Sequence, residues 1–83
     1  MAGAYEVIEL LEEAEKNNKR SFDIATRDKI IKESGGQIKE SDFSFDKITG
    51  EYIYNRGTLK DIKKIIKEEK IKQNKEAEYN IQK

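Results

Sequence analysis

Apolar residues in the first part of the chain recur at the spacing of an amphipathic helix. The stripe within residues 4–17 consists of Val7, Leu10, Leu11 and Ala14, with Ile8 at its edge. Glutamates fill the remaining arc and crowd the first turns, where the positive end of a helix dipole favours them. A polar run, Asn-Asn-Lys-Arg at 17–20, follows. The pattern therefore predicts a helix that ends at this run.

Residues 21–36, SFDIATRDKIIKESGG, allow two interpretations. In the one we favour, Phe22 and Ile24 alternate as in a short strand, and Thr26 then caps a helix over residues 27–34. The chain would enter the rest of the fold through a strand and a second helix.

The alternative is one longer helix that Ser21 or Asp23 caps. In both interpretations the helix ends at Gly35-Gly36, because glycine readily adopts the left-handed conformation that closes a helix. Ile30 and Ile31 then face the core.

Aromatic and polar residues alternate on both sides of a Thr-Gly turn in residues 43–54, which is typical of a β-hairpin. We expect residues 47–50 to form the loop. Asp46 can accept hydrogen bonds from the turn backbone, and Gly50 can supply the positive φ of a type I turn with a bulge.

This loop sets the register of the hairpin. Phe45 then lies opposite Tyr52 and Phe43 opposite Tyr54, and directly opposed residues share one face of a sheet. Four of the seven aromatic residues therefore gather on one face. The other face is expected to carry Ser44, Asp46, Glu51 and Ile53.

A third helical pattern begins after Arg56-Gly57, with Thr58 as its cap and Asp61 as the acid of a capping box. Its apolar stripe consists of Leu59, Ile62, Ile65 and Ile66. The stripe then lapses, and residues 72–83 form a polar stretch that extends the helix, frays or pairs with a second copy.

The predicted fold is thus α+β: an N-terminal helix, a short strand or second helix, an aromatic hairpin and a long C-terminal helix. We expect a single small domain over residues 1–71, with residues 72–83 as an extension. The aromatic face of the hairpin is expected to pack on Val7, Leu10, Leu11, Ile30, Ile62, Ile65 and Ile66.

The composition excludes several kinds of catalytic and metal-binding site, whereas it says little about the fold. The chain has neither histidine nor cysteine, so serine–histidine and cysteine–histidine nucleophile systems and zinc–thiolate sites are excluded. No phosphate-binding glycine loop occurs. Asp42-x-Ser44-x-Asp46 begins like a calcium loop, but Lys47 and Ile53 stand where glycine and glutamate are needed. We expect no cofactor and no metal.

The net charge is zero, but the charges are unevenly placed. Residues 1–15 hold five glutamates and no basic residue, whereas residues 58–75 hold seven lysines against three acidic residues. We favour the interpretation that the two helices complement each other. The alternative is a nucleic-acid surface made of Arg56, Lys60, Lys64 and Lys67, with the hairpin as the wing of a winged helix.

A third hypothesis is a histidine-free RNase, in which Tyr52, Tyr54, Arg56 and Lys60 would position RNA and stabilise a pentavalent phosphate. The segments YEVIELLEEAE and NRGTLKDIKKIIK resemble the two ends of HicA-type messenger-RNA interferase toxins. The likeness covers about a quarter of the chain. It implies an α-β-β-α outline, and the family's catalytic histidine has no counterpart here.

Elimination leaves protein binding as the favoured function: a non-enzymatic regulator, inhibitor, antitoxin or phage accessory protein. Candidate contact residues are Glu6, Glu9, Glu13 and Ile53, and the edge of the hairpin could add a strand to a partner's sheet. A homodimer through the C-terminal helix is a further expectation. With no apolar run of about 18 residues and no signal pattern, we expect a cytoplasmic protein without a membrane partner. The excess of isoleucine and lysine suggests an AT-rich bacterial or phage genome.

Overall fold

A computed structural model describes residues 3–82 of the chain, with side chains as far as Lys72. It confirms the α+β class. The elements are α1 (Gly3–Lys16), β1 (Ser21–Phe22), α2 (Ile24–Glu33), a 3-10 helix η1 (Glu40–Asp42), β2 (Phe43–Asp46), β3 (Glu51–Tyr54) and α3 (Leu59–Gln82).

The three strands form an antiparallel sheet in the order β1-β3-β2. The predicted hairpin register is confirmed, with Phe43 opposite Tyr54 and Phe45 opposite Tyr52. Phe22 of β1 pairs with Tyr52 from the other side. The hairpin's second strand is therefore the central strand, and β2 is an edge strand.

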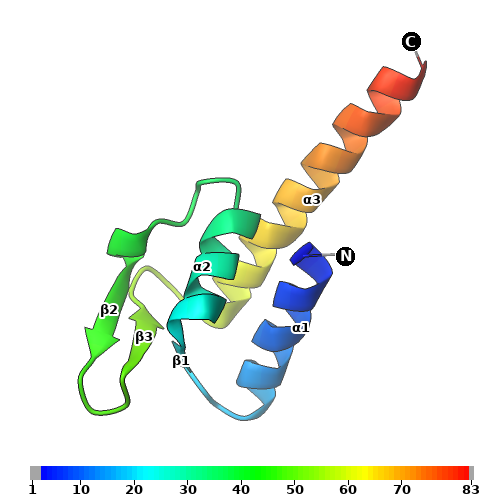
Figure 1. The fold of residues 1–83 in the computed structure, drawn as a ribbon. Coiled ribbons are helices and arrows are strands. Elements are labelled where there is room, and N and C mark those ends of the chain that lie inside the picture. Colours follow the sequence, from blue (N-terminus) through cyan, green and yellow to red (C-terminus); the bar gives the residue numbers. More distant parts are fainter. Residues whose placement is uncertain (1–2, 83) are drawn as a thin grey trace.

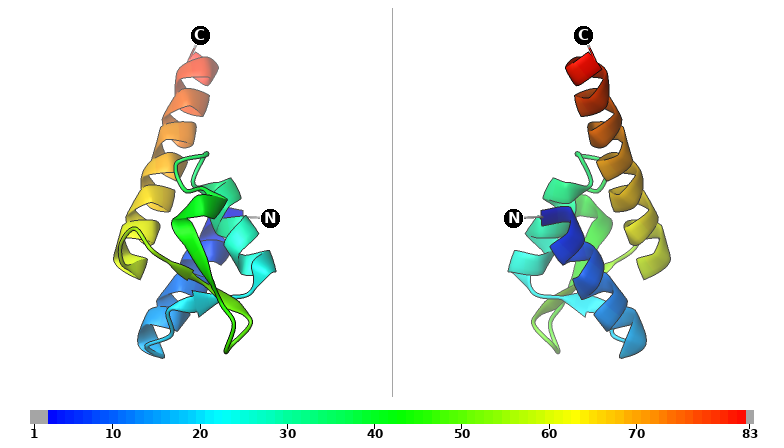
Figure 2. Two further views of the ribbon diagram at one scale, coloured as in Figure 1. Left: turned by 90° about the vertical axis from the view of Figure 1, so that its left-hand side faces the viewer. Right: turned by 90° about the vertical axis from the view of Figure 1, so that its right-hand side faces the viewer.

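The helices and the sheet lie on different sides of the molecule. Figure 1 shows β2 along one side, α1 and α3 toward the other, and α2 between them. In the left-hand view of Figure 2, β2 is nearest to the viewer and no helix lies in front of it. The molecule measures 53 × 25 × 22 Å, because α3 extends well beyond the other elements.

One core joins all the elements. Its buried apolar members are Val7, Ile8, Leu11, Ala14, Phe22, Ile30, Ile38, Phe43, Tyr54, Ile62 and Ile66. Most of the predicted core is confirmed, while Ile65 and Tyr52 are only partly buried against it.

Two predicted core residues are exposed instead. Phe45 is 55% exposed and Leu10 is 38% exposed. Phe45 belongs to the aromatic pair nearest the hairpin turn, whereas the other pair, Phe43 and Tyr54, is the one that the buried core includes. The buried stripe of α1 includes Ile8, so it is rotated away from Leu10.

The second helix begins three residues earlier than predicted, because its cap is Asp23 and not Thr26. The Asp23 carboxylate accepts a hydrogen bond from the Thr26 N–H at 2.8 Å. The helix ends at Glu33, and Gly35 follows with a φ of 67°, as the glycine pair predicted.

Asp61, the predicted acid of the capping box, caps the start of α3. The Asp61 carboxylate accepts from the Thr58 N–H at 2.8 Å and from its hydroxyl at 3.3 Å. The helix continues past residue 72, and its backbone is described as far as Gln82. Whether it pairs with a second copy depends on side chains that lie outside the described residues.

The acidic and basic helices complement each other, as we favoured. Lys63 Nζ of α3 lies 2.6 Å from Glu15 Oε1 and 3.9 Å from Glu12 Oε2 of α1. The Lys63 side chain is 19% exposed, so this charge is largely enclosed between the two helices. Among the described residues no helix is both long and apolar enough to cross a membrane.

Candidate protein-interaction site

The outer edge of β2 carries backbone groups that the sheet does not use. The Asn55 N–H donates to the Asp42 carbonyl at 2.8 Å, which fixes the phase of the antiparallel ladder. Hydrogen-bonded pairs alternate in such a ladder. Ser44 and Asp46 therefore direct their backbone groups toward β3, and Phe43 and Phe45 direct theirs outward.

The two outward residues differ in what their backbone groups meet. The Phe43 N–H donates to the Glu40 carbonyl of the 3-10 helix. No hydrogen bond from or to the backbone of Phe45 occurs within the described part of the chain. The Phe45 N–H and carbonyl thus form a donor–acceptor pair that faces solvent at the middle of the strand.

Apolar side chains accompany these free groups. Besides the half-exposed ring of Phe45, Ile48 at the tip of the hairpin is 94% exposed. Hydrophobic side chains beside unpaired strand groups are the features that strand addition uses, because main-chain hydrogen bonds give affinity and side-chain contacts give specificity. We call the outward groups of residues 43–47 together with the Phe45 ring the β2 edge.

Several contacts hold the β2 edge in place. The rings of Phe45 and Tyr52 lie 5.2 Å apart between centroids, and the Arg27 guanidinium of α2 lies 4.5 Å above the Tyr52 ring. In the turn, the Ile48 N–H donates to the Asp46 carboxylate at 2.9 Å, and Gly50 has a φ of 74°. The strand is therefore preorganised, which lowers the entropic cost of binding.

The start of β2 is anchored by Asp42, which is buried although it is charged. Its carboxylate accepts from the Lys39 N–H at 3.0 Å and lies 3.5 Å from Arg56 Nη1. Arg56, predicted to contact nucleic acid, is thus placed against a carboxylate. The hydrophobic pattern does not predict this contact. Its only indication in the sequence is an acidic residue, Asp42, directly before the strand.

The three predicted nucleic-acid lysines have a different environment. Lys60, Lys64 and Lys67 are exposed on one side of α3. None of them takes part in any of the seven ion pairs found among the described residues. The neighbouring carboxylate of Asp61 accepts from the Thr58 N–H. The lysine stripe is therefore not neutralised by direct ion pairs.

The predicted protein-contact residues do not gather at one place. Glu6, Glu9 and Glu13 are exposed along the outer side of α1, and Glu6 pairs with Lys29 at 3.3 Å. Ile53 is half-buried on the central strand, opposite Ser21 and Ser44. Its backbone has neighbours on both sides, so of the two hairpin strands only β2 has an edge that can receive another strand.

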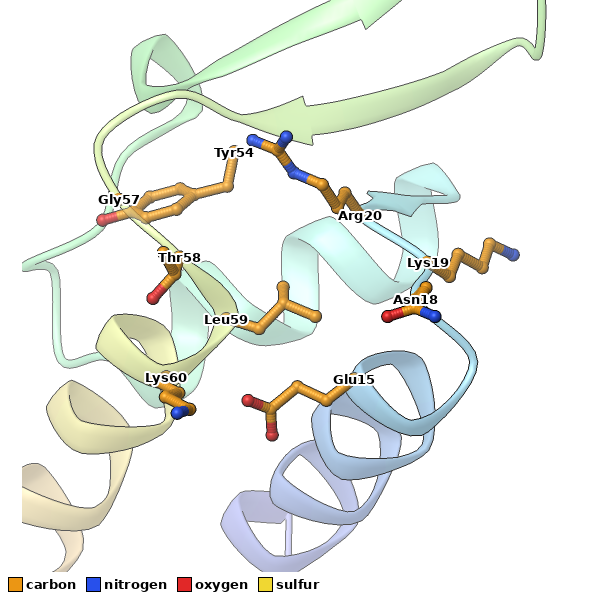
Figure 3. Close-up of a pocket in the computed structure, with 9 residues that line it drawn as sticks. All are labelled: Glu15, Asn18, Lys19, Arg20, Tyr54, Gly57, Thr58, Leu59 and Lys60. Carbon is orange, nitrogen blue, oxygen red and sulfur yellow. The ribbon is translucent and has the colours of Figure 1, made fainter.

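Figure 3 shows an open pocket of about 620 Å³ between the end of α1 and the start of α3. Its lining residues are Glu15, Asn18, Lys19, Arg20, Tyr54, Gly57, Thr58, Leu59 and Lys60. In the figure Lys19 extends away from the pocket, whereas Tyr54 forms part of its wall and its hydroxyl lies toward Gly57. Two residues of the RNase hypothesis, Tyr54 and Lys60, thus line one pocket.

The surroundings of Tyr54 determine what its hydroxyl can do in this pocket. Burial, and next the nearby Asp42, raise the pKa of Tyr54, while Arg56 acts in the opposite direction. Its hydroxyl stays protonated at neutral pH and can donate a hydrogen bond. Tyr52, the other tyrosine of that hypothesis, lies beneath Arg27 and does not line the pocket.

The chain matches no protein-family model, no curated protein and no solved structure. The resemblance to HicA-type toxins therefore rests on the two quoted segments alone.

Proposed function

We propose that this chain is a small non-enzymatic protein-binding module of the inhibitor, antitoxin or phage accessory type, and that it binds an extended segment of its protein partner beside β2. The observation that carries the proposal is Phe45, whose outward N–H and carbonyl have no partner among the described residues and whose ring is half exposed. We further propose that it acts in the cytoplasm of a bacterium or of a phage's host.

The physical reasoning is that free edges are normally protected. Natural sheets protect their edges with charged residues, prolines, bulges or covering segments, because an open edge pairs with other chains. Here the middle of the edge is an aromatic residue, and charged residues stand only toward its two ends, Asp42 before the strand and Asp46 and Lys47 at the turn. An exposed edge of this kind is suited to binding a strand.

Affinity capture with cross-linking from an extract of the source cells tests the proposal. Phe45→Lys removes the ring and adds a charge at the β2 edge, and we expect it to reduce the captured partner by about tenfold or more. Ser44→Lys is the matched control, because Ser44 is exposed on the opposite face of the same strand. Circular dichroism verifies that both variants fold.

The result that would overturn the proposal is equally direct. It would be capture of the same protein, at equal yield, by the wild-type chain and by folded Phe45→Lys. Loss of the partner in both lysine variants would also count against it, since the effect would then be one of charge and not of the edge.

A second candidate function, nucleic-acid binding, is supported by the lysine stripe of Lys60, Lys64 and Lys67. Three cations along one helix, none of them in an ion pair with another described residue, can contact phosphates. The affinity would then fall with salt at a logarithmic slope of about 0.9 per contact on duplex DNA, or roughly 3 in total.

Gel-shift titrations at several salt concentrations separate this function from protein binding. A variant with all three lysines of the stripe changed to glutamate should lose binding. The control variant changes Lys16, Lys32 and Lys39, which are exposed elsewhere, and has the same net charge. If neither duplex nor single strand shifts at low salt, this second function is excluded.

A further inference from the structure

We infer that one partner of the β2 edge is the β2 edge of a second copy, so that two chains pair their edge strands around a two-fold axis at Phe45. This inference rests on the proposed function, because it uses the same free groups. It adds the identity of the partner and the register of the pairing.

The outward groups of β2 are complementary to themselves. Phe45 offers a donor and an acceptor, and an antiparallel Phe45–Phe45 pair would satisfy both through two hydrogen bonds. Two residues further along the ladder, Lys47 lies opposite Phe43. The Asp46 carbonyl accepts from the Gly50 N–H in the turn, so the Lys47 N–H on the same peptide points outward.

The Lys47 N–H can therefore donate to the Phe43 carbonyl of the second copy. The Phe43 N–H is already bonded to Glu40, so the ladder ends there. Two Lys47–Phe43 bonds and two Phe45–Phe45 bonds give four in total. The two-fold axis makes every bond occur twice, which is the isologous arrangement of most dimers.

Side chains support the same register. Directly opposed residues of a hydrogen-bonded pair share a face, so the two half-exposed Phe45 rings would lie together across the axis. Lys47 of each copy would come beside the start of β2 in the other copy. That start is acidic, with Glu40 exposed and Asp42 directly before the strand.

The size of the contact predicts a weak dimer. A strand of four residues covers less surface than the roughly 1,200 Å² that stable interfaces bury. The pairing should therefore depend on concentration. The edge would remain available to a different protein segment in dilute solution.

A register-specific cross-link tests the inference, because the native chain has no cysteine. In the proposed register the two residues at position 45 have Cα atoms about 5.5 Å apart, within the range that a disulfide spans. Phe45→Cys should then oxidise to a covalent dimer about tenfold faster than Ser44→Cys, whose two copies lie diagonally at about 7–8 Å. Sedimentation velocity of the wild-type chain should show dimer increasing with concentration, and Phe45→Lys should remain monomeric.

Three results would overturn the inference: a wild-type chain that stays monomeric at millimolar concentration, equal cross-linking at positions 44 and 45, or a dimer that Phe45→Lys leaves intact. The last result would place the contact elsewhere, as in a homodimer through α3. None of them bears on the capture experiment, so loss of a different protein on Phe45→Lys would still support strand addition.

Discussion

Phe45 and Tyr54 lie on the same face of the sheet but have opposite surroundings. Tyr54 is 7% exposed, whereas more than half of Phe45, near the turn, is exposed to solvent. Alternation placed both on the aromatic face, and the register confirms it. Which part of that face the helices cover depends on where α2 and α3 lie, and a pattern of alternation carries no such information.

Tyr54→Phe should change the free energy of unfolding by less than about 1 kcal/mol at pH 7, because the hydroxyl makes no hydrogen bond to another described residue. Above pH 10 we expect the two proteins to differ in stability. Burial raises the pKa of Tyr54 in the folded state, so the unfolded chain ionises first and stability falls as pH rises through the folded pKa.

Urea unfolding followed by circular dichroism between pH 7 and 11 measures this effect. Wild type should lose more stability than Tyr54→Phe over that range. Part of the loss should persist in the variant, since the pKa of Lys63 is also raised, first by its hydrogen bond to Glu15. Identical alkaline profiles for the two proteins would show that Tyr54 is not in the buried environment described.

At the scale of elements, caps and ion pairs determine where helices begin and how they pair. Asp23 begins α2 three residues before the predicted start, since an aspartate in extended conformation accepts a hydrogen bond from the N–H three residues on. Sequence alone left Ser21, Asp23 and Thr26 as competing caps, because all three residue types cap helices. The two-residue strand β1 decides between them by pairing Ser21 and Phe22 with β3.

Asp23→Ala should lower the free energy of unfolding by about 1 kcal/mol at pH 7, and Asp23→Asn should cost less, because asparagine also caps helices. The pKa of Asp23 is lowered by its hydrogen bonds from Thr26. Its charge therefore stabilises the fold above the unfolded pKa, near 4, and this contribution is lost as pH falls through the folded pKa.

Chemical denaturation of wild type and Asp23→Asn at pH 7 and pH 2 tests that sign. The difference in stability between the two proteins should shrink at pH 2. A difference that grows on acidification would show that the Asp23 carboxylate does not cap α2.

The contact between α1 and α3 can be tested by a double-mutant cycle on Lys63→Met and Glu15→Gln. Lys63 lies 2.6 Å from Glu15 and both side chains are largely covered, so we expect a favourable coupling that exceeds the error of the measurement. Lys60→Met with Glu15→Gln serves as the control cycle, because Lys60 is exposed and has no ion pair among the described residues. Coupling no larger in the first cycle than in the second would contradict the packing of α1 on α3.

At the scale of the whole molecule, the sequence predicted the elements better than the surfaces. Period-2 alternation and the Thr-Gly turn were sufficient for the hairpin and its register, and helical spacing was sufficient for α1 and α3. Ile38 and Ser34 are buried in the loop between α2 and η1, where no periodicity applies. Ser34 donates to the Ile31 carbonyl and accepts from the Ile38 N–H, and neither helical spacing nor alternation predicts such bonds.

The sequence predicted that an edge of the hairpin could bind a strand, but it did not predict which of the two hairpin strands has the free edge. The edge of the hairpin could be proposed for strand addition from the sequence. That β2 and not β3 is the free strand depends on β1 pairing with β3, and two residues of strand give almost no pattern. The lysine stripe was predicted residue by residue, but its lack of ion pairs among the described residues could only be learned from the structure.

The most direct test of the account is amide hydrogen exchange, resolved by residue, in dilute solution where the chain is monomeric. Ser44 and Asp46 direct their N–H groups toward β3 and should be protected, whereas the N–H of Phe45 between them should exchange rapidly. It should become protected when a partner strand is bound. A Phe45 amide that is as protected as that of Ser44 in the dilute monomer would show that the β2 edge is already occupied, and the proposed binding site would not exist.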